Sequence, residues 1–358
     1  HLLNNVEVVS TGYQNLPKDR ITGSFGSISS EELAKVPSPN VIQRLEGKVT
    51  GMKITLYSGD KTFDYTNTLK TPNSSTHTVG NMEYNMNVRG VSSLQGETFP
   101  LIVVDGVITE MDLSTINPND IENITVLKDA AAASIWGVRA ANGVIVVTTK
   151  KGNENTRPKV SFSTSLTFAG RPDINYLKMM NSSEMLDYEK ELVDDGILYN
   201  VPADSYNDAQ YYFPEGTRLA LALKSGTITQ DAYNTRVSAL SKIDNRSQIS
   251  KYFMQPSSSQ QYNLSVSGGG NNSQYYYSAS YTKENPSEKR ESAQRLTLDL
   301  NNSWKLFNWA TLSTDFKGSF FTYIDDGTNI ASFYPSSGRS LMPYENIVDN
   351  NGKGISYN

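Results

Sequence analysis

The chain holds few of the side chains that enzymes use as nucleophiles, acids, bases or metal ligands. It has no cysteine and only two histidines, His1 and His77, and neither histidine lies in a catalytic or metal-binding motif. The glycine-containing stretches 137–143 and 268–270 lack the spacing and the following lysine of a phosphate-binding loop. We therefore expect no catalytic residues, no metal site and no bound cofactor, and we expect that the protein is not an enzyme.

The composition narrows the classes of protein to which the chain could belong. The net charge is −5 and no dense run of lysine and arginine is present, so binding to nucleic acid is not expected. Only 37% of the residues are hydrophobic, yet the chain contains 21 Tyr, 12 Phe and 3 Trp. No run of about eighteen apolar residues exists, which excludes a helical membrane span, whereas a β-barrel strand needs only about ten alternating residues. The first residues lack the pattern of a secretion signal, so we expect that such a signal has been removed.

The stretch 87–152 combines strands, tight turns and short helices in one block of the size of a small domain. Asp105-Gly106 between two β-prone runs predicts a hairpin at 101–108. Asn117 before Pro118 predicts a helical turn, because proline fits the first helical position. Three further elements are expected: a strand at 124–127, a helix at 130–136 capped by Asp129 and ended by Gly137, and a buried strand at 144–149 after the turn Asn142-Gly143.

The residues before this block have a weaker pattern. The stretch 29–32 (SSEE) has the serine and acidic residues of a helix N-terminus, and a second short helix is expected at 40–46, ending at Gly47. The stretch 57–85 is rich in Thr, Ser, Asn and Gly, so we expect a long polar loop there. The segment 6–12 (VEVVSTG) predicts an exposed strand that another protein could pair with through its main chain, or else an ordinary first strand.

From Pro158 onward, apolar and polar residues alternate in segments of about ten residues, which is the pattern of transmembrane β-barrel strands. Such a segment, tilted by about 45°, spans roughly 25 Å, the height of the apolar band of a barrel. Five segments carry apolar residues on one face: Val160, Phe162, Leu166 and Phe168; Tyr262, Leu264 and Val266; Tyr275, Tyr277, Ala279 and Tyr281; Leu296, Leu298, Leu300 and Trp304; and Leu312, Phe316 and Phe320.

The connections between these segments alternate in length. Residues 268–273 and 305–308 form short turns, whereas the connections 171–260 and 285–294 are longer. If the N-terminal block lies on the periplasmic side, all short turns fall on that side, as barrels require. We therefore predict an α+β plug domain followed by antiparallel transmembrane β-barrel strands. A soluble β-sandwich is the alternative fold, although it would not naturally produce this order of long and short connections.

These motifs resemble the SusC/RagA family of TonB-dependent outer-membrane transporters. The resemblance covers most of the chain through Phe320, with a poor match over 171–260. It is carried by VEVVSTGYQ (6–14), LEGKVTGMKI (45–54), NVRGVSSL (87–94), PLIVVDGVI (100–108), INPNDIENITVLKDAAAASIWGVRAANGVIVVTTKKG (116–152) and QQYNLSVSGGGNNSQYYYSASY (260–281).

The resemblance implies a domain organisation. Residues 1–14 would be the TonB-box segment, 15–153 the plug domain, and 154–358 the first part of the transmembrane β-barrel with a long first extracellular loop. A whole barrel of this kind has about 22 strands, so the chain is expected to be the first part of a longer protein with an incomplete barrel. Its place would be the bacterial outer membrane, with the plug towards the periplasm.

The resemblance also implies a function and partners. Members of the family actively import large nutrients, mostly oligosaccharides and sometimes peptides, with energy from TonB, which acts with ExbB and ExbD. A SusD-like surface lipoprotein would cover the pore, outer-membrane lipid would surround the barrel, and two transporter–lipoprotein pairs could form a dimer. The TonB box would consist of Val6, Glu7, Val8, Val9, Ser10 and Thr11.

Two groups of plug residues are candidates for specific roles. Arg89 and Arg139 could form ion pairs between plug and barrel, because a buried arginine–carboxylate pair fixes one arrangement while adding little net stability. The alternative is that both arginines are solvated at the plug surface. The residues expected in a substrate-facing plug loop are Ser92, Ser93, Leu94 and Gln95.

Two other functions stay open at this point. A siderophore or cobalamin receptor would use the same TonB-dependent mechanism but would work without a lipoprotein lid. A secreted, soluble glycan-binding or adhesive β-protein would share the β-rich pattern without a membrane.

Overall fold

A computed structural model of the chain forms two compact units. The first unit contains 1–168, 258–285 and 291–325, and the second contains 169–257, 286–290 and 326–358. The structure describes residues 8–10, 15–17, 24–58, 76–79, 82–88, 99–109, 111–128, 134–176, 178–197, 213–324, 341–349 and 351–355.

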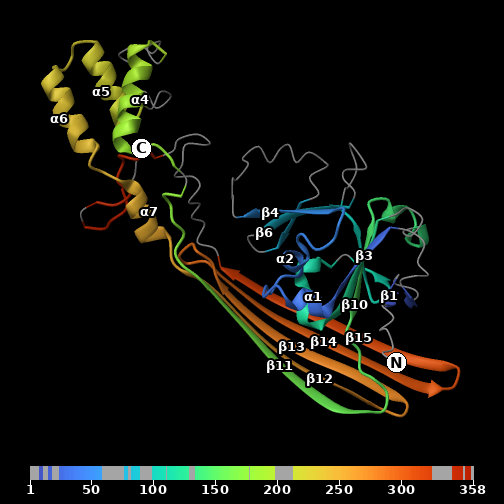
Figure 1. The fold of residues 1–358 in the computed structure, drawn as a ribbon. Helices are drawn as coiled ribbons and strands as arrows, with labels where there is room; N and C mark the ends of the chain where they lie inside the picture. Colours follow the sequence, from blue (N-terminus) through green and yellow to red (C-terminus); the bar gives the residue numbers. More distant parts are fainter. Residues whose placement is uncertain are drawn as a thin grey trace, which may run out of the picture. The chain divides into compact units, whose positions relative to one another are not determined.

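The N-terminal part of the first unit is an α+β domain around a five-stranded sheet (Figure 1). The central strand β10 pairs in parallel with β7 and antiparallel with β9, and the strand order is β3-β9-β10-β7-β8. The strands are β3 (Phe25–Ser29), β7 (Leu101–Val104), β8 (Val107–Ile108), β9 (Ile121–Leu127) and β10 (Val144–Thr149). The predicted hairpin and the two predicted strands at 124–127 and 144–149 are thereby confirmed.

Strand β10 is buried on both of its faces, which explains its continuous apolar sequence. Ile145 and Val147 pack into one hydrophobic cluster, which includes Leu33 and Ile42 of the helices on that side. Val144 and Val146 pack into a second cluster on the opposite face. Burial of a side chain of this size stabilises a fold by about 1.5–3 kcal/mol, so the two clusters hold the sheet between two layers.

Short helices and helical turns complete this domain. Ser29 caps α1 with a capping box, in which Glu32 N–H donates to Ser29 Oγ (3.3 Å) and Ser29 N–H donates to Glu32 Oε2 (3.2 Å). Asn40 caps α2, and Gly47 follows with a φ of +69°, so both predicted helix boundaries are confirmed. The elements are α1 (Ser30–Ala34), α2 (Val41–Leu45) and the 3₁₀ turns η3 (Leu113–Thr115), η4 (Pro118–Asp120), η5 (Ser134–Trp136) and η6 (Val138–Ala140).

The expectation of one polar loop over 57–85 is wrong where the structure describes this stretch. β4 (Met52–Ser58), β6 (Met82–Val88) and β5 (Thr76–Val79) form an antiparallel three-stranded sheet in the order β4-β6-β5. Apolar residues recur at every second position from Met82 to Val88, and Met86 is fully buried in the core. Composition hid this alternation, because Glu83, Asn85 and Asn87 fill the intervening positions and Thr, Ser and Asn dominate the rest of the stretch. The expected helix 130–136 is described only in its last three residues, which are 3₁₀, and its cap Asp129 lies outside the described residues.

Near the N-terminus, β1 (Val8–Ser10) pairs antiparallel with β2 (Asn15–Pro17). The predicted strand within 6–12 is thus confirmed over its described residues. Val9 lies opposite Leu16 in this two-stranded ribbon.

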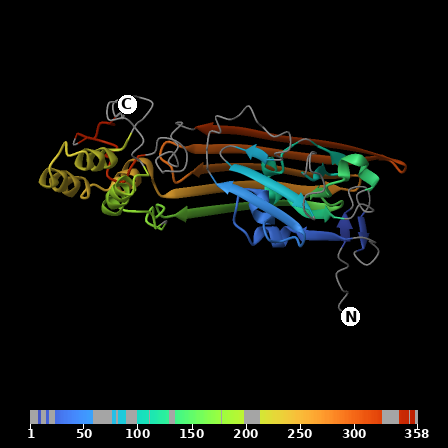
Figure 2. The same ribbon diagram turned by 90° about the horizontal axis from the view of Figure 1, so that it is seen from above.

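Five long antiparallel strands follow, in the order β11-β12-β13-β14-β15, and lie side by side (Figure 2). Their order and their alternation of long and short connections confirm all five predicted strands. The bounds are β11 (Thr156–Ala169), β12 (Ser257–Gly270), β13 (Ser273–Asn285), β14 (Ser292–Phe307) and β15 (Ala310–Ile324). At 13 to 16 residues each, these strands exceed the about ten residues that a membrane crossing needs.

The described part of the long connection between β11 and β12 contains four helices of the second unit. The sequence pattern did not predict these helices. These helices are α4 (Ser182–Asp194), α5 (Glu215–Lys224), α6 (Gln230–Leu240) and α7 (Asn245–Phe253). Val193, Leu221 and Tyr233 form the core between α4, α5 and α6. Ile249 of α7 packs with Ile347, so the segment 341–349 belongs to the same unit. Among the described residues, no helix combines the length and the apolar character needed to cross a membrane.

A buried carboxylate ties α4 to the segment 341–349. Tyr344 donates its hydroxyl hydrogen to Glu189, with 2.8 Å to Oε2 and 3.0 Å to Oε1, and Gly216 N–H donates to the tyrosine oxygen at 3.2 Å. A Cβ at Gly216 would lie only 2.0 Å from Glu189 Oε2, so the three residues leave no free space. Burial raises the pKa of Glu189 from 4.5 to about 7, although the hydrogen bonds from Tyr344 and Thr217 act in the opposite direction.

This shift predicts that the second unit loses stability as pH rises. The folded unit keeps a proton on Glu189 from pH 4.5 to about 7, whereas the unfolded chain has released it. Because the folded state binds more protons in this window, its stability is greatest below pH 4.5 and declines up to about pH 7, by at most about 3 kcal/mol. Hydrogen exchange of the α4 amides in the full-length protein, corrected for intrinsic rates, measures this change. Glu189→Gln should remove the pH dependence, and equal protection of the wild-type amides at pH 5 and pH 8 would contradict the prediction.

Candidate functional site

The two faces of the long-strand sheet differ in polarity. One face carries the large apolar residues that the alternation predicted, and they are open to the surroundings; Phe162 is 64% and Phe168 is 71% exposed. The opposite face carries Gln261, Asn263, Ser278, Thr297 and Asp299, which are buried. An apolar outer face and a polar inner face are the reverse of a soluble domain and are expected of a wall in lipid.

Within the described part of the chain, polar side chains join the N-terminal domain to the polar face at three places, of which the first is the turn η4. Asn117 donates to Asn263 Oδ1 of β12 (2.8 Å) and to Asp120 Oδ2 (2.9 Å). Tyr276 of β13 donates its hydroxyl hydrogen to Asp120 Oδ1 (2.9 Å). Pro118 starts η4 and Asn117 caps it, so the local sequence holds both polar side chains at the sheet.

Asp120 is a carboxyl group in an almost water-free place. Burial raises its pKa above the ordinary value, although hydrogen bonds from Tyr276 and Asn117 and the charge of Lys150 favour the ionised form. Lys150 itself donates to Asn119 O (2.8 Å), which places the ammonium group next to this turn. The Asp120 carboxylate is thereby surrounded by hydrogen-bond donors. Its role in the described structure is to join the N-terminal domain to the long-strand sheet.

The second contact centres on Lys317 of β15. Its ammonium group lies 2.9 Å from Asp299 Oδ2 and 3.0 Å from Asp315 Oδ1, both on the sheet, and 3.3 Å from Asp105 Oδ2 of the N-terminal domain. It also donates to Thr149 Oγ1 (3.2 Å) at the end of β10. Three carboxylates around one lysine have excess negative charge, so Lys317 is the group that makes the approach of Asp105 to the sheet favourable.

Asp105 is held in place from within its own domain. It occupies the tight turn between β7 and β8 with a φ of +50°, followed by Gly106 at +87°. Thr149 donates its N–H to Asp105 Oδ1 (2.9 Å) and its hydroxyl to Oδ2 (2.6 Å). The carboxylate is therefore preorganised towards Lys317, and we call Lys317, Asp105, Thr149, Asp299 and Asp315 the lysine cluster.

The third contact uses main-chain acceptors. Arg295 of β14 donates Nη2 to Pro39 O (2.6 Å) and Nη1 to Ser114 O. Pro39 lies between α1 and α2, and Ser114 lies in η3, so one guanidinium binds two separate loops of the domain. Its planar fork of donors suits such a bridge better than a lysine would.

The interface has little apolar character between its polar contacts. Ser280 and Thr297 lie opposite each other on β13 and β14. Among the described residues, their hydroxyl oxygens and Asp299 Oδ1 are buried and have no hydrogen-bond partner. A polar interface can separate at a lower free-energy cost than an apolar one, because water replaces each broken hydrogen bond.

The residues singled out from the sequence lie elsewhere or outside the described residues. Arg89 and the loop residues Ser92, Ser93, Leu94 and Gln95 fall outside them, as do Val6, Glu7 and Thr11. Val8, Val9 and Ser10 form β1. Arg139 lies at the exposed turn η6, and its pairing with the barrel stays a prediction.

Sequence reasoning missed the residues that do join the two parts. The available signal was a charged side chain in the middle of a strand, on the face opposite the apolar residues. Asp299, Asp315 and Lys317 all have this pattern. A charge in that place has to meet another charge inside the barrel, although its partner cannot be named from the strand alone.

The known proteins that resemble this chain in sequence are described as TonB-dependent receptors. Residues 17–144 match the family model described as TonB-dependent Receptor Plug Domain. The TonB-dependent receptor SusC of Bacteroides thetaiotaomicron is 37% identical over 171 residues, which cover 46% of this chain and 15% of that protein. The TonB-dependent receptor P39 of Formosa agariphila is 28% identical over 328 residues, which cover 92% of this chain and 26% of that protein.

Solved structures extend the similarity to the fold. The RagAB peptide importer in its open-open state superposes with a TM-score of 0.66 at 26% identity and covers 98% of this chain and 36% of the solved chain. Its closed-closed state gives a TM-score of 0.63, again at 26% identity, with 94% of this chain and 35% of the solved chain covered. The chain thus spans about a third of the solved chains it matches and a smaller share of the curated relatives.

Proposed function

Because this chain belongs to the SusC/RagA family of TonB-dependent outer-membrane transporters, we propose that it helps to import a large nutrient across the bacterial outer membrane. The family consists of transporters and not of enzymes, and its members are outer-membrane β-barrel proteins with a plug domain. In this chain the N-terminal α+β domain is the plug, and β11–β15 are strands of the barrel wall.

The observation that carries this proposal is the polar attachment of the plug to the barrel wall. Lys317 of the wall binds Asp105 of the plug, and Tyr276 of the wall binds Asp120 of the plug. A plug held by hydrogen bonds and ion pairs closes the pore at rest, yet it can exchange these bonds for water when it is pulled. Import then requires work, and a strand pulled from the periplasmic side can deliver it.

We propose TonB, acting with ExbB and ExbD, as the partner that pulls. It would pair with the TonB box, residues 6–11, by strand addition. In the described structure β1 is paired with β2 on one edge, so TonB would use the other edge or displace β2.

A SusD-like surface lipoprotein is the proposed second partner, and two such pairs could form a dimer. The proposed substrate class is an oligosaccharide or a peptide. One curated relative is named SusC and one solved neighbour is described as a peptide importer, so the family resemblance leaves both substrate classes open. A lidded importer of this type is supported over a siderophore receptor, because the solved relatives at 26% identity are RagAB structures.

The test is a substitution in the TonB box of the full-length protein. Val9→Pro removes a main-chain N–H that strand addition needs, whereas the control Val9→Thr keeps it and stays β-branched. We expect Val9→Pro to reduce nutrient uptake to the level of a strain without TonB, while the outer-membrane amount of the transporter and its lipoprotein stays unchanged. Uptake at the wild-type rate in Val9→Pro would contradict the proposal.

A further inference from the structure

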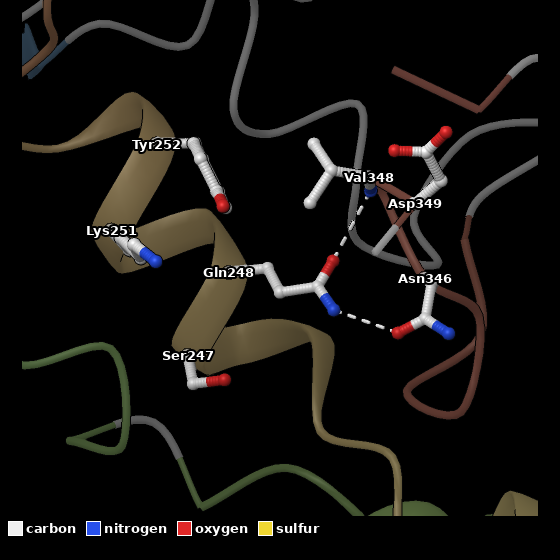
Figure 3. A pocket seen from close by; sticks show the side chains of 7 residues that line it. All are labelled: Ser247, Gln248, Lys251, Tyr252, Asn346, Val348 and Asp349. Atoms are coloured by element: carbon white, nitrogen blue, oxygen red, sulfur yellow. Dashed lines mark hydrogen bonds between the residues drawn. The ribbon is translucent and has the colours of Figure 1, made fainter. Parts of the chain in front are cut away.

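The second unit contains a polar pocket between α7 and the segment 346–349 (Figure 3). Its volume is about 510 Å³, which is large enough for a small ligand. Ser247, Gln248, Lys251 and Tyr252 of α7 line one side, and Asn346 and Asp349 line the other. The two sides come from different connections of the barrel strands, one after β11 and one after β15. Because neighbouring strands are antiparallel, both connections leave the sheet at the end opposite the short turns.

Direct hydrogen bonds hold the two sides of this pocket together. Gln248 donates Nε2–H to Asn346 Oδ1 (2.7 Å), and its Oε1 accepts from the N–H groups of Ile347 (2.8 Å) and Val348 (3.3 Å). Nearby, Asn245 donates its side-chain amide to Met342 O (2.8 Å). The pocket is therefore preformed, so a ligand would not have to order its walls on binding.

The lining groups offer donors, an acceptor and one aromatic ring. Asp349 Oδ1 accepts from the N–H groups of Asn351 (2.8 Å) and Lys353 (2.9 Å), which fixes the carboxylate and leaves Oδ2 without a protein partner among the described residues. Tyr252 is half-buried, and Lys251 Nζ lies 5.0 Å from the centre of its ring. Figure 3 shows the Tyr252 hydroxyl and the Lys251 ammonium pointing into the space in front of Gln248.

This chemistry selects among ligand classes. Lys251 and Asp349 cancel in charge, so the pocket does not favour a strongly charged ligand. Among the described residues that line the pocket, Val348 is the only aliphatic one, so this lining offers few of the apolar anchors that side chains of a peptide would need. A neutral ring with many hydroxyls fits best, because its hydroxyls donate to the carboxylate and accept from the ammonium, and its C–H face can lie on the tyrosine.

We propose that this pocket is a binding subsite for a sugar residue of an oligosaccharide. The proposal rests on the proposed function, since it names the substrate class of the importer and a place where the substrate is held. The short turns face the periplasm in that function, so the connections that carry the pocket residues leave the barrel strands at the end from which the nutrient arrives.

The experiment is calorimetric titration of the full-length transporter, purified with its co-purifying partners in detergent. The probes are maltoheptaose, laminarihexaose, xylohexaose and a mannan oligosaccharide, with a tryptic digest of casein as the peptide probe. Tyr252→Ala removes the ring, and Asp349→Asn keeps the turn acceptor while removing the charge. Tyr188→Ala is the matched control, because Tyr188 is an exposed tyrosine of α4 outside the pocket.

We expect at least one oligosaccharide to bind the wild type and the Tyr188→Ala variant alike. Its affinity should fall about tenfold or more in Tyr252→Ala and about fivefold or more in Asp349→Asn. Equal oligosaccharide affinity in all variants would overturn the subsite, and binding of peptides alone, or of no oligosaccharide, would overturn the ligand class. This titration needs no TonB, so oligosaccharide binding can be absent while TonB-dependent uptake is intact. Conversely, uptake can be lost in Val9→Pro while oligosaccharide binding persists.

Discussion

Replacing Lys317 with methionine is expected to loosen the plug from the barrel wall. The ammonium group lies within 3.3 Å of three carboxylates, and only one of them, Asp105, belongs to the plug. The side chains of Asp105 and Asp299 are 9% and 7% exposed, so the substitution leaves two buried carboxylates without their cation. Removal of one partner of a buried ion pair costs about 3–5 kcal/mol, and here much of this cost appears as weaker attachment of the plug.

Hydrogen exchange in the full-length transporter in lipid nanodiscs measures this loosening. We expect the amides of β10 and of the β7–β8 turn to exchange faster in Lys317→Met, because Thr149 and Asp105 connect these elements to the lysine. Lys317→Arg keeps the charge and should stay close to the wild type. Unchanged exchange in Lys317→Met would show that the lysine cluster does not hold the plug.

A double-mutant cycle separates the contact across the interface from the contacts within the wall. Asp105→Asn removes only the plug carboxylate, and the Asn side chain can still accept from Thr149. If the Lys317–Asp105 pair couples plug and wall, the two substitutions together should cost less than the sum of their separate effects. Strict additivity would place the whole effect of Lys317 within the wall, at Asp299 and Asp315.

The parts of this fold that the sequence predicted are those that depend on local pattern. The five long strands follow from alternation over 13 to 16 residues together with short turns. The start of α1 follows from Ser29 and Glu32, which satisfy each other's N–H groups within four residues. The turn at Asp105-Gly106 follows from the need for positive φ at both positions.

The parts that the sequence did not predict depend on distant partners. Lys317 and Thr149 are 168 residues apart, and nothing near either residue names the other. Asp105 was recognised as a turn residue, but its second use as an anion for the barrel wall is visible only in three dimensions. The connection 171–260 has no barrel-strand alternation, and the helices α4–α7 within it do not follow from that absence; the local signal for the first of them is the capping box of Asn181 and Glu184 at the start of α4.

Replacing Gly152 with alanine is expected to prevent correct assembly of the plug with the barrel. Gly152 lies between β10, the last plug strand, and β11, the first barrel strand, and it is buried. A Cβ at this position would lie 2.3 Å from Tyr275 O, 2.5 Å from Gly268 O and 2.6 Å from Tyr275 N. Its φ is not in the left-handed region, so the cost arises from space and not from backbone conformation.

The atoms that a methyl group would meet cannot move independently. Gly268 and Tyr275 are paired in the ladder between β12 and β13, so a shift of either residue breaks hydrogen bonds of the wall. One methylene too many in a packed interior costs about 1–3 kcal/mol when side chains can yield, and here the three nearest atoms all belong to the main chain. We therefore expect a loss at or above the upper end of this range.

The fraction of folded full-length protein in outer membranes, read from its heat-modifiable band in gel electrophoresis, measures this effect. Gly152→Ala should show little folded protein. Gly170→Ala is the matched control, because a Cβ there meets no atom within 4 Å, and it should fold as the wild type does. An equal folded fraction in both variants would contradict the prediction, because it would show that the space around Gly152 can accept a methyl group. A selective loss in Gly152→Ala would instead mean that the barrel wall closes around the plug connection, so that plug and wall assemble together.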